Sequence, residues 1–263
     1  MCDACMLADG ILEATGYPYR RALTQVELEH GDVDRVREDI DAAEQRVAKA
    51  GAPLVHKMLA QLYDEMRPLV EAGDVAGIAR VRASHTAELA TALKVAVKVN
   101  VKAGKAQVRD SARKAGVKLA AKPPGKDVKK ALPYILAKSD AISEQVAAQI
   151  EATVRFQALK AARAAEYLED DFDAGARALV ASATSLGRES YAVGRVFGYD
   201  EVKQDIAEVV YTAILDDKVC DVCLEADGTT YTEDDIDAGF DSAPNDGCLG
   251  GSFCRCYTVL IYR

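Results

Sequence analysis

Hydrophobic residues recur every three or four positions through most of the chain, which is the spacing of one buried face of an α-helix. The first such segment begins at a capping candidate, Asp32, and is expected to end at Gly51. The second has Pro53 near its first turn and Gly73 after its end, and a third begins at Asp74. The pattern therefore predicts successive helices over the first part of the chain.

The segment KVAVKVNVK, residues 94–102, fits two periods at once. Its valines alternate, which is a strand signal, whereas its lysines are four residues apart, which is a helix signal. The spacing of the cations continues to Arg113, and we therefore predict a helix. The stretch AAKPPGKD, residues 120–127, interrupts the pattern. Two further helices are predicted at about 139–170 and 173–197, although three glycines weaken the second.

The pattern changes after Gly198, where residues 208–216 and 256–263 are rich in strand-forming residues. We expect these two strands to pair antiparallel and to hold an acidic, cysteine-bearing loop between them. The expected fold class is mainly α: an elongated helical N-terminal body with a small α+β, two-stranded C-terminal module. The expected domains are an N-terminal segment (1–21), the helical body (22–198) and the cysteine-rich module (199–263).

The net charge of −9 over 263 residues conceals two segments of opposite sign. Residues 94–138 hold thirteen Lys and Arg against two Asp, whereas residues 216–246 hold eleven acids against one Lys. The sequence has no run of 18 apolar residues and does not open on a signal-peptide pattern, so we expect a protein made in a cytosol without a membrane segment. In that reducing compartment, seven cysteines favour metal binding or burial over a disulfide framework.

Five cysteines fall within the last 44 residues of the chain: Cys220, Cys223, Cys248, Cys254 and Cys256. A Cys-x-x-Cys turn directs two thiolates at one metal, and zinc takes four such ligands in a tetrahedron. We expect four of these five cysteines to bind one structural Zn²⁺, with Cys248 or Cys256 as alternatives for one position. The Asp227-Gly228 turn is expected to lead the chain away from the metal. The competing interpretation is that the cysteines are buried thiols.

The two ends of the chain share a nonapeptide. CDACMLADG at residues 2–10 and CDVCLEADG at residues 220–228 are identical at six of nine positions. The first copy has no second pair of cysteines nearby. Cys2 and Cys5 could therefore form a metal-free turn, contribute to a second or shared metal site, or act as a redox pair.

Six cations follow one face of the helix predicted in the basic segment, at steps of three or four residues: Lys94, Lys98, Lys102, Lys105, Arg109 and Arg113. Further lysines carry this charge to Lys130, so the basic stripe spans residues 94–130. Such a ridge could neutralise DNA phosphates without sequence preference. Aromatic residues are not interleaved with it, so stacking on single strands is not indicated. The alternative is a solvated helix face that pairs with the protein's own acids or with an acidic partner.

The C-terminal third resembles the corresponding module of phage head morphogenesis proteins, the MuF-like minor head proteins. The family pattern is an Asp before Cys-x-x-Cys, then Asp-Gly, an acidic or Pro-rich loop, His-Pro-x-Cys-Arg-Cys and a terminal strand. The residues that fall into place are Asp216, Cys220, Cys223, Asp227, Gly228, Cys254, Arg255 and Cys256. Gly194-Arg195 also matches a helical Gly-Arg pair, whereas an upstream Arg-Thr-Glu motif is matched poorly by residues 183–185. The family histidine would fall at Gly251, which cannot bind a metal, and Cys248 is its expected replacement.

The resemblance covers about residues 178–263. It implies a structural minor capsid protein of a tailed bacteriophage, made in the host cytoplasm and retained in the capsid interior. Its implied partners are the portal protein, the major capsid protein or both, and the implied role is in head assembly and DNA packaging, with DNA contact associated with some members.

Motifs of catalysis are not visible in the sequence: we find no nucleophile elbow, Walker A loop or paired catalytic carboxylates. A zinc hydrolase would need an open coordination position and a general base, which a set of cysteines does not supply. We therefore expect a protein that is not an enzyme. The alternative to a head protein is a cytosolic zinc-containing protein that binds DNA non-specifically or acts as a regulator. The acidic charge of the cysteine module disfavours this alternative.

Overall fold

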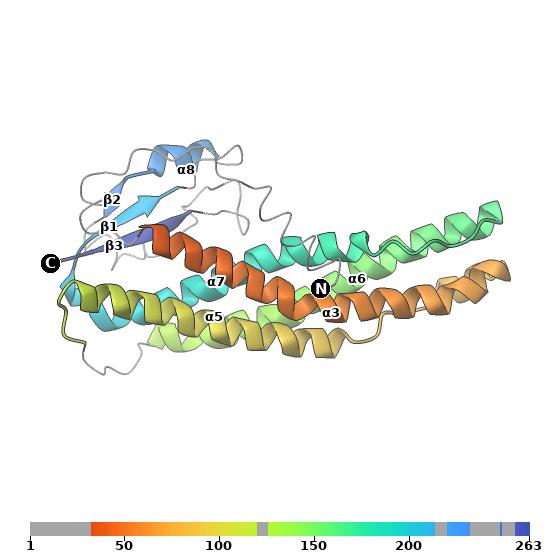
Figure 1. Cartoon of the computed structure of the whole chain (residues 1–263), viewed down its shortest axis with the longest axis horizontal. Helices are drawn as coiled ribbons and strands as arrows, with labels where there is room; N and C mark the ends of the chain where they lie inside the picture. Colours follow the sequence, from red (N-terminus) through yellow and green to blue (C-terminus); the bar gives the residue numbers. More distant parts are fainter. Residues whose placement is uncertain (1–32, 120–125, 214–219, 232–247, 249–255) are drawn as a thin grey trace. The chain divides into compact units, whose positions relative to one another are not determined.

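The computed structural model describes residues 33–119, 126–213, 220–231, 248 and 256–263. The predicted N-terminal segment with Cys2 and Cys5 lies outside these residues, and so does Cys254. Within them the fold is mainly α with a small antiparallel sheet near the C-terminus, which confirms the predicted fold class (Figure 1).

The elements follow one another in an order that keeps the strands at the end of the chain. They are α3 (Val33–Glu71), α4 (Val75–Ile78), α5 (Thr86–Lys114), α6 (Lys126–Ala164), α7 (Asp173–Val202), the 3₁₀ turn η1 (Lys203–Asp205), β1 (Ile206–Thr212), α8 (Asp221–Ala226), β2 (Thr230–Tyr231) and β3 (Tyr257–Tyr262).

Helix α3 runs unbroken through the Gly51–Pro53 segment, where the sequence predicted the end of one helix and the start of another. That prediction was wrong because Gly51 serves packing rather than termination. A Cβ at Gly51 would lie 2.7 Å from Leu179 and 3.2 Å from Leu89, so the missing side chain lets these two leucines approach the helix. Burial of this face compensates for the hydrogen bond that Pro53 cannot donate.

The helix predicted from Asp74 is divided. Asp74 caps α4 through its carboxylate, which accepts a hydrogen bond from the N–H of Gly77 at 2.8 Å, but α4 ends at Ile78. Backbone without helical structure follows, and α5 begins only at Thr86. Residues 94–102 lie within α5, so the helical interpretation of the alternating valines and spaced lysines is confirmed.

Glycines in α5 and α7 bring the backbones of these two helices into contact. A Cβ at Gly104 would overlap the carbonyl oxygen of Tyr191, and one at Gly194 would overlap that of Val101. The glycines that weaken α7 as an isolated helix are thus required by its packing. Helix α6 begins at Lys126, well before the predicted position, and carries Pro133 within it.

The described residues divide into two compact units. Unit 1 comprises Gln45–Ala96 and Leu136–Leu186, and it is entirely helical apart from its connections. Unit 2 comprises residues 33–44, the described part of Val97–Ile135, and the described part of Gly187–Arg263. The sheet and the C-terminal cysteines therefore belong to the same unit as the first turns of α3, most of α5 and the end of α7.

The sheet of unit 2 has the strand order β2-β1-β3, and both pairings are antiparallel (Figure 1). The β1–β3 pairing matches the prediction, whereas the two-residue strand β2 was not foreseen. Alternate residues of β3 enter different cores. Tyr257, Val259 and Ile261 pack in a cluster with residues of α3 and α7, whereas Leu260 and Tyr262 pack against a cluster that includes residues of α5.

Candidate metal centre

The first two cysteines of the candidate centre are positioned by the short helix α8. Cys220 has extended backbone and precedes the helix, and its carbonyl oxygen accepts a hydrogen bond from the N–H of Leu224 at 2.9 Å. Cys223 lies one turn further and is buried. Because residues three apart lie on the same side of a helix, the two side chains face one region.

Cys248 completes a cluster of three sulfur atoms. Its Sγ lies 3.3 Å from that of Cys223 and 3.8 Å from that of Cys220, and all three sulfurs lie within 4.8 Å of one another. Thiolates bound to one tetrahedral Zn²⁺ at about 2.3 Å would be about 3.8 Å apart. The three cysteines therefore have the spacing of ligands to a single metal ion, and no disulfide joins any two of the four cysteines that the structure describes.

Cys256 lies next to this cluster without joining it. It is half-buried and packs against the small apolar cluster formed by Tyr211, Ala213, Cys223 and Ala226. Among the cysteines in the described ranges, only Cys220, Cys223 and Cys248 meet as potential ligands. The fourth ligand therefore stays a prediction, with Cys254 and Cys256 as its candidates.

The Asp227-Gly228 turn fixes the cysteine pair to the sheet. The carboxylate of Asp227 accepts a hydrogen bond from the N–H of Ala213 at 2.8 Å, and the N–H of Gly228 donates to the carbonyl of Tyr211 at 2.8 Å. Gly228 has a φ of +79°, which favours glycine. The turn leads the chain back to β1, along which it continues as β2, and the expectation that the turn leads away from a metal stays a prediction.

Tyr211 reaches the cluster from near the end of β1, one residue before the strand ends, and sequence reasoning missed it. Its side chain is fully buried, and its hydroxyl donates a hydrogen bond to the Sγ of Cys223 at 3.3 Å. In the sequence this tyrosine is one strand residue among several, because its partner lies in helix α8, twelve positions later. Only the contact between β1 and α8 in the folded structure shows that this tyrosine reaches the cysteines.

The predicted basic stripe is divided between internal ion pairs and exposed lysines. Lys94 pairs with Asp140 at 2.6 Å, and Arg113 pairs with Asp110 at 2.8 Å. Glu201 pairs with both Lys105, at 2.6 Å, and Arg109, at 3.2 Å. Since Glu201 is buried, these two cations compensate its charge within unit 2, which is the internal pairing that the alternative interpretation of the stripe described.

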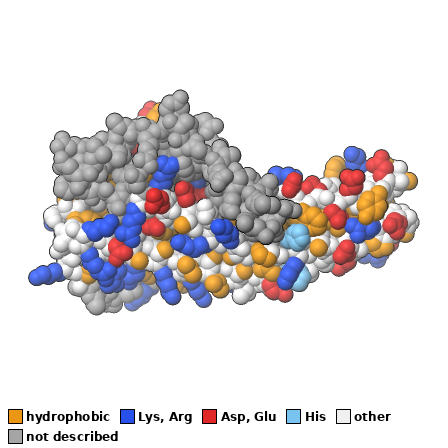
Figure 2. Space-filling view, viewed as in Figure 1, with side chains coloured by type: hydrophobic (Ala, Val, Ile, Leu, Met, Phe, Trp, Pro, Cys, Tyr) orange, Lys and Arg blue, Asp and Glu red, His pale blue; other side chains and the backbone are white. Residues whose placement is uncertain are grey.

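The remaining two cations of the stripe, Lys98 and Lys102, are exposed. Neither forms an ion pair with any residue in the described ranges. Arg113, Lys118 and Lys129 are also exposed in unit 2. Figure 2 shows Lys and Arg side chains gathered over α5 on this face of the molecule.

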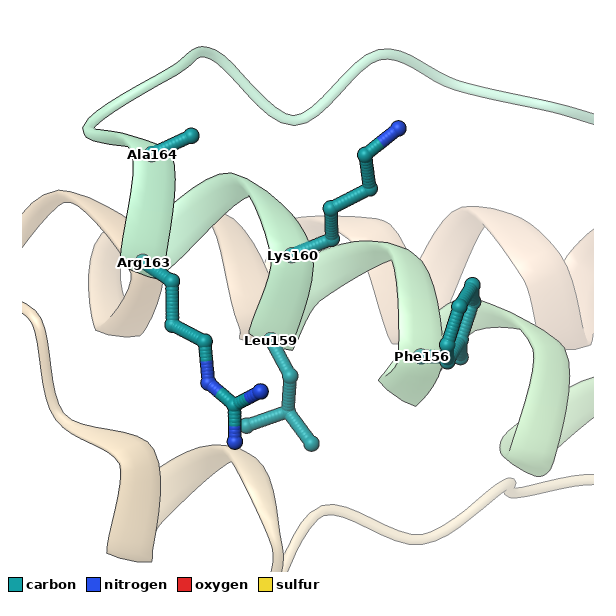
Figure 3. Close-up of a pocket in the computed structure, with 5 residues that line it drawn as sticks. All are labelled: Phe156, Leu159, Lys160, Arg163 and Ala164. Carbon is teal, nitrogen blue, oxygen red and sulfur yellow. The ribbon is translucent and has the colours of Figure 1, made fainter.

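A shallow groove of about 440 Å³ lies in unit 1, on the last turns of α6. Its lining residues are Phe156, Leu159, Lys160, Arg163 and Ala164 (Figure 3). The groove is mainly apolar, with the Phe156 ring 70% exposed. None of the predicted site residues lines it.

The fold and the cluster define a mainly helical protein whose small C-terminal sheet carries a three-cysteine centre able to hold a metal ion. No family model, curated protein or solved structure matches the chain. In the part of the chain that the structure describes, none of the helices has a stretch both long and apolar enough to cross a membrane.

Proposed function

We propose that the cysteine cluster binds a structural Zn²⁺. Cys220, Cys223 and Cys248 supply three thiolates, and Cys254 or Cys256 supplies the fourth. A soft, all-sulfur ligand set suits Zn²⁺ and disfavours Mg²⁺ or Ca²⁺, which take oxygen ligands. The bound ion would join the α8 turn to the segment before β3, two parts of the chain whose cysteines are far apart in sequence. A closed set of four cysteines is structural rather than catalytic.

We further propose that the chain is a structural minor head protein of a tailed bacteriophage. The observation that carries this proposal is the arrangement of the matched residues. Cys220, Cys223, Asp227 and Gly228 form one connected unit with β1, and the terminal strand β3 pairs with that same strand. The matched residues that the structure describes thus belong to one compact motif, and this arrangement is what supports the proposal. Association with the portal or major capsid protein, inside the capsid, is part of this proposal.

Mass spectrometry of purified virions from a phage that encodes this chain tests the assignment. We expect peptides of the chain in intact particles, in few copies relative to the major capsid protein, and protected from added protease until the capsid is opened. A chain that is abundant in the infected lysate yet missing from the particles would contradict it and would favour a cytosolic zinc-containing DNA-binding or regulatory protein.

DNA contact is proposed for the exposed lysines rather than for the whole basic stripe. Lys98 and Lys102 are available for phosphates, whereas Lys105 and Arg109 already pair with buried Glu201. We expect K98E/K102E to reduce retention on double-stranded DNA of any sequence, because two phosphate contacts become repulsive. The variant K57E/K160E, which makes the same charge change at exposed positions of unit 1, is the matched control.

The binding should be measured at several salt concentrations. A phosphate-led contact weakens steeply as salt rises, and the slope should be smaller in K98E/K102E than in the control. Equal retention of the two variants, or binding that does not respond to salt, would rule out this surface as a DNA contact.

A further inference from the structure

We infer that Tyr211 is a positioning residue of the metal centre, which holds the Cys223 thiolate in its ligating orientation through the hydroxyl hydrogen bond. The inference rests on the proposed metal binding and assigns a role to a residue outside the ligand set.

The backbone of Tyr211 is fixed on both sides. Its N–H donates to the carbonyl of Thr229 at 2.9 Å, and its own carbonyl accepts from Gly228. On the other edge of β1, Tyr211 lies opposite Thr258 of β3. A residue in the central strand of a sheet has little freedom to move, so the hydroxyl direction is set by the sheet and not by the sulfur.

The side chain is equally constrained. The ring is fully buried and packs with Ala213, Cys223 and Ala226, so it cannot swing into solvent. Its hydroxyl lies 3.3 Å from the Cys223 sulfur, which in turn lies 3.3 Å from the sulfur of Cys248. The hydrogen bond therefore connects the rigid strand to the ligand at the buried side of the cluster.

A donor at this position matches the charge of the centre. Four thiolates on one Zn²⁺ carry two excess negative charges, and three thiolates carry one. An O–H group directed at a buried thiolate stabilises that charge, and hydrogen bonds to ionised acceptors are stronger than those between neutral groups. Groups that orient metal ligands in this way typically contribute 10- to 100-fold in metal affinity.

The test is the Zn²⁺ affinity of the full chain, measured by competition with a chromophoric chelator. We expect Tyr211→Phe to bind Zn²⁺ about 10-fold more weakly than the unmodified chain. Tyr191→Phe is the matched control, because Tyr191 is also buried in unit 2 and its hydroxyl donates to Asp39 at 3.1 Å, with no contact to the cysteines. Its affinity should be unchanged.

A spectroscopic measurement separates an effect on the Cys223 thiolate from a general loss of stability. With Co²⁺ in place of Zn²⁺, the thiolate-to-metal charge-transfer band should move to lower energy in Tyr211→Phe, because the sulfur loses its donor. Incorporation of 3-fluorotyrosine at position 211 retains the shape of the ring and strengthens the donor, and should move the band to higher energy. This second substitution keeps the test decisive should Tyr211→Phe fold poorly.

The outcomes separate a failure of this inference from a failure of the proposed metal binding. An unmodified chain that binds one Zn²⁺, with unchanged affinity in Tyr211→Phe and an unchanged band with 3-fluorotyrosine, would overturn the role of Tyr211 and leave the centre standing. An unmodified chain that binds no metal would overturn both.

Discussion

At the scale of single residues, the geometry of the cysteine cluster depends on groups outside the set of potential ligands. Asp227 is the clearest case, because its carboxylate accepts a backbone hydrogen bond from Ala213 at the end of β1. The Cys-x-x-Cys pair could be predicted from spacing alone, and so could a turn at Asp-Gly. The sequence could not predict that the chain pairs with β1 after the turn, because the two paired segments are more than ten residues apart.

Asp227→Ala should destabilise unit 2 by about 1–3 kcal/mol, because the N–H of Ala213 would lose its acceptor in a half-buried position. Asp227→Asn keeps an oxygen at the same place and should cost less. Urea denaturation followed by circular dichroism measures both, with Asp221→Asn on the exposed side of α8 as the control. Equal stability of the Ala and Asn variants would show that the hydrogen bond is unimportant.

At the scale of elements, hydrophobic periodicity predicted most of the helices but missed the break between α4 and α5 and the continuity of α3 through Gly51 and Pro53. The stop predicted at Gly51 and the weakness predicted for α7 both arise from the same assumption, that glycine disrupts a helix. In this protein Gly51, Gly104 and Gly194 are sites of close packing, and the contacts that require them come from distant segments. The lysine spacing identified residues 94–102 as helical because the cations of α5 share one face, whose side chains are exposed or half-buried.

Gly194→Ala should destabilise unit 2 by more than about 2 kcal/mol, because the added methyl group would overlap the backbone of Val101 and force α5 and α7 apart. Gly116→Ala supplies the comparison. Gly116 has a φ of +85° but open space around it, so its replacement should cost about 1–2 kcal/mol from backbone strain alone. The midpoints of thermal or urea denaturation of the two variants test this difference. A larger loss of stability in Gly116→Ala than in Gly194→Ala would refute the packing argument.

At the scale of the whole chain, the cysteine cluster lies on a unit that has other sources of stability, so a bound metal would be a local support. Strands β1 and β3 enter two apolar clusters together with residues of α3, α5 and α7 in unit 2. The sequence could not reveal this packing, because contributing residues such as Val36 and Ile261 lie at opposite ends of the described chain.

Removal of the metal should therefore release α8 and the cysteine loop while the helices and the β1–β3 pair remain. Cys220→Ser, or treatment with a strong chelator, is expected to leave the far-UV circular dichroism nearly unchanged. Hydrogen exchange should accelerate in residues 220–231 and remain slow in 257–262. Cooperative loss of the whole of unit 2 on metal removal would contradict this division.

The central claim is that Cys220, Cys223 and Cys248 belong to one metal centre. The most direct measurement is the zinc content of the full chain, purified under reducing conditions and analysed by inductively coupled plasma mass spectrometry, together with that of Cys248→Ser. We predict one zinc ion per chain for the unmodified protein and a loss of most of it in the variant. A zinc content near zero in the reduced, folded protein, or full retention of zinc in Cys248→Ser, would contradict the account.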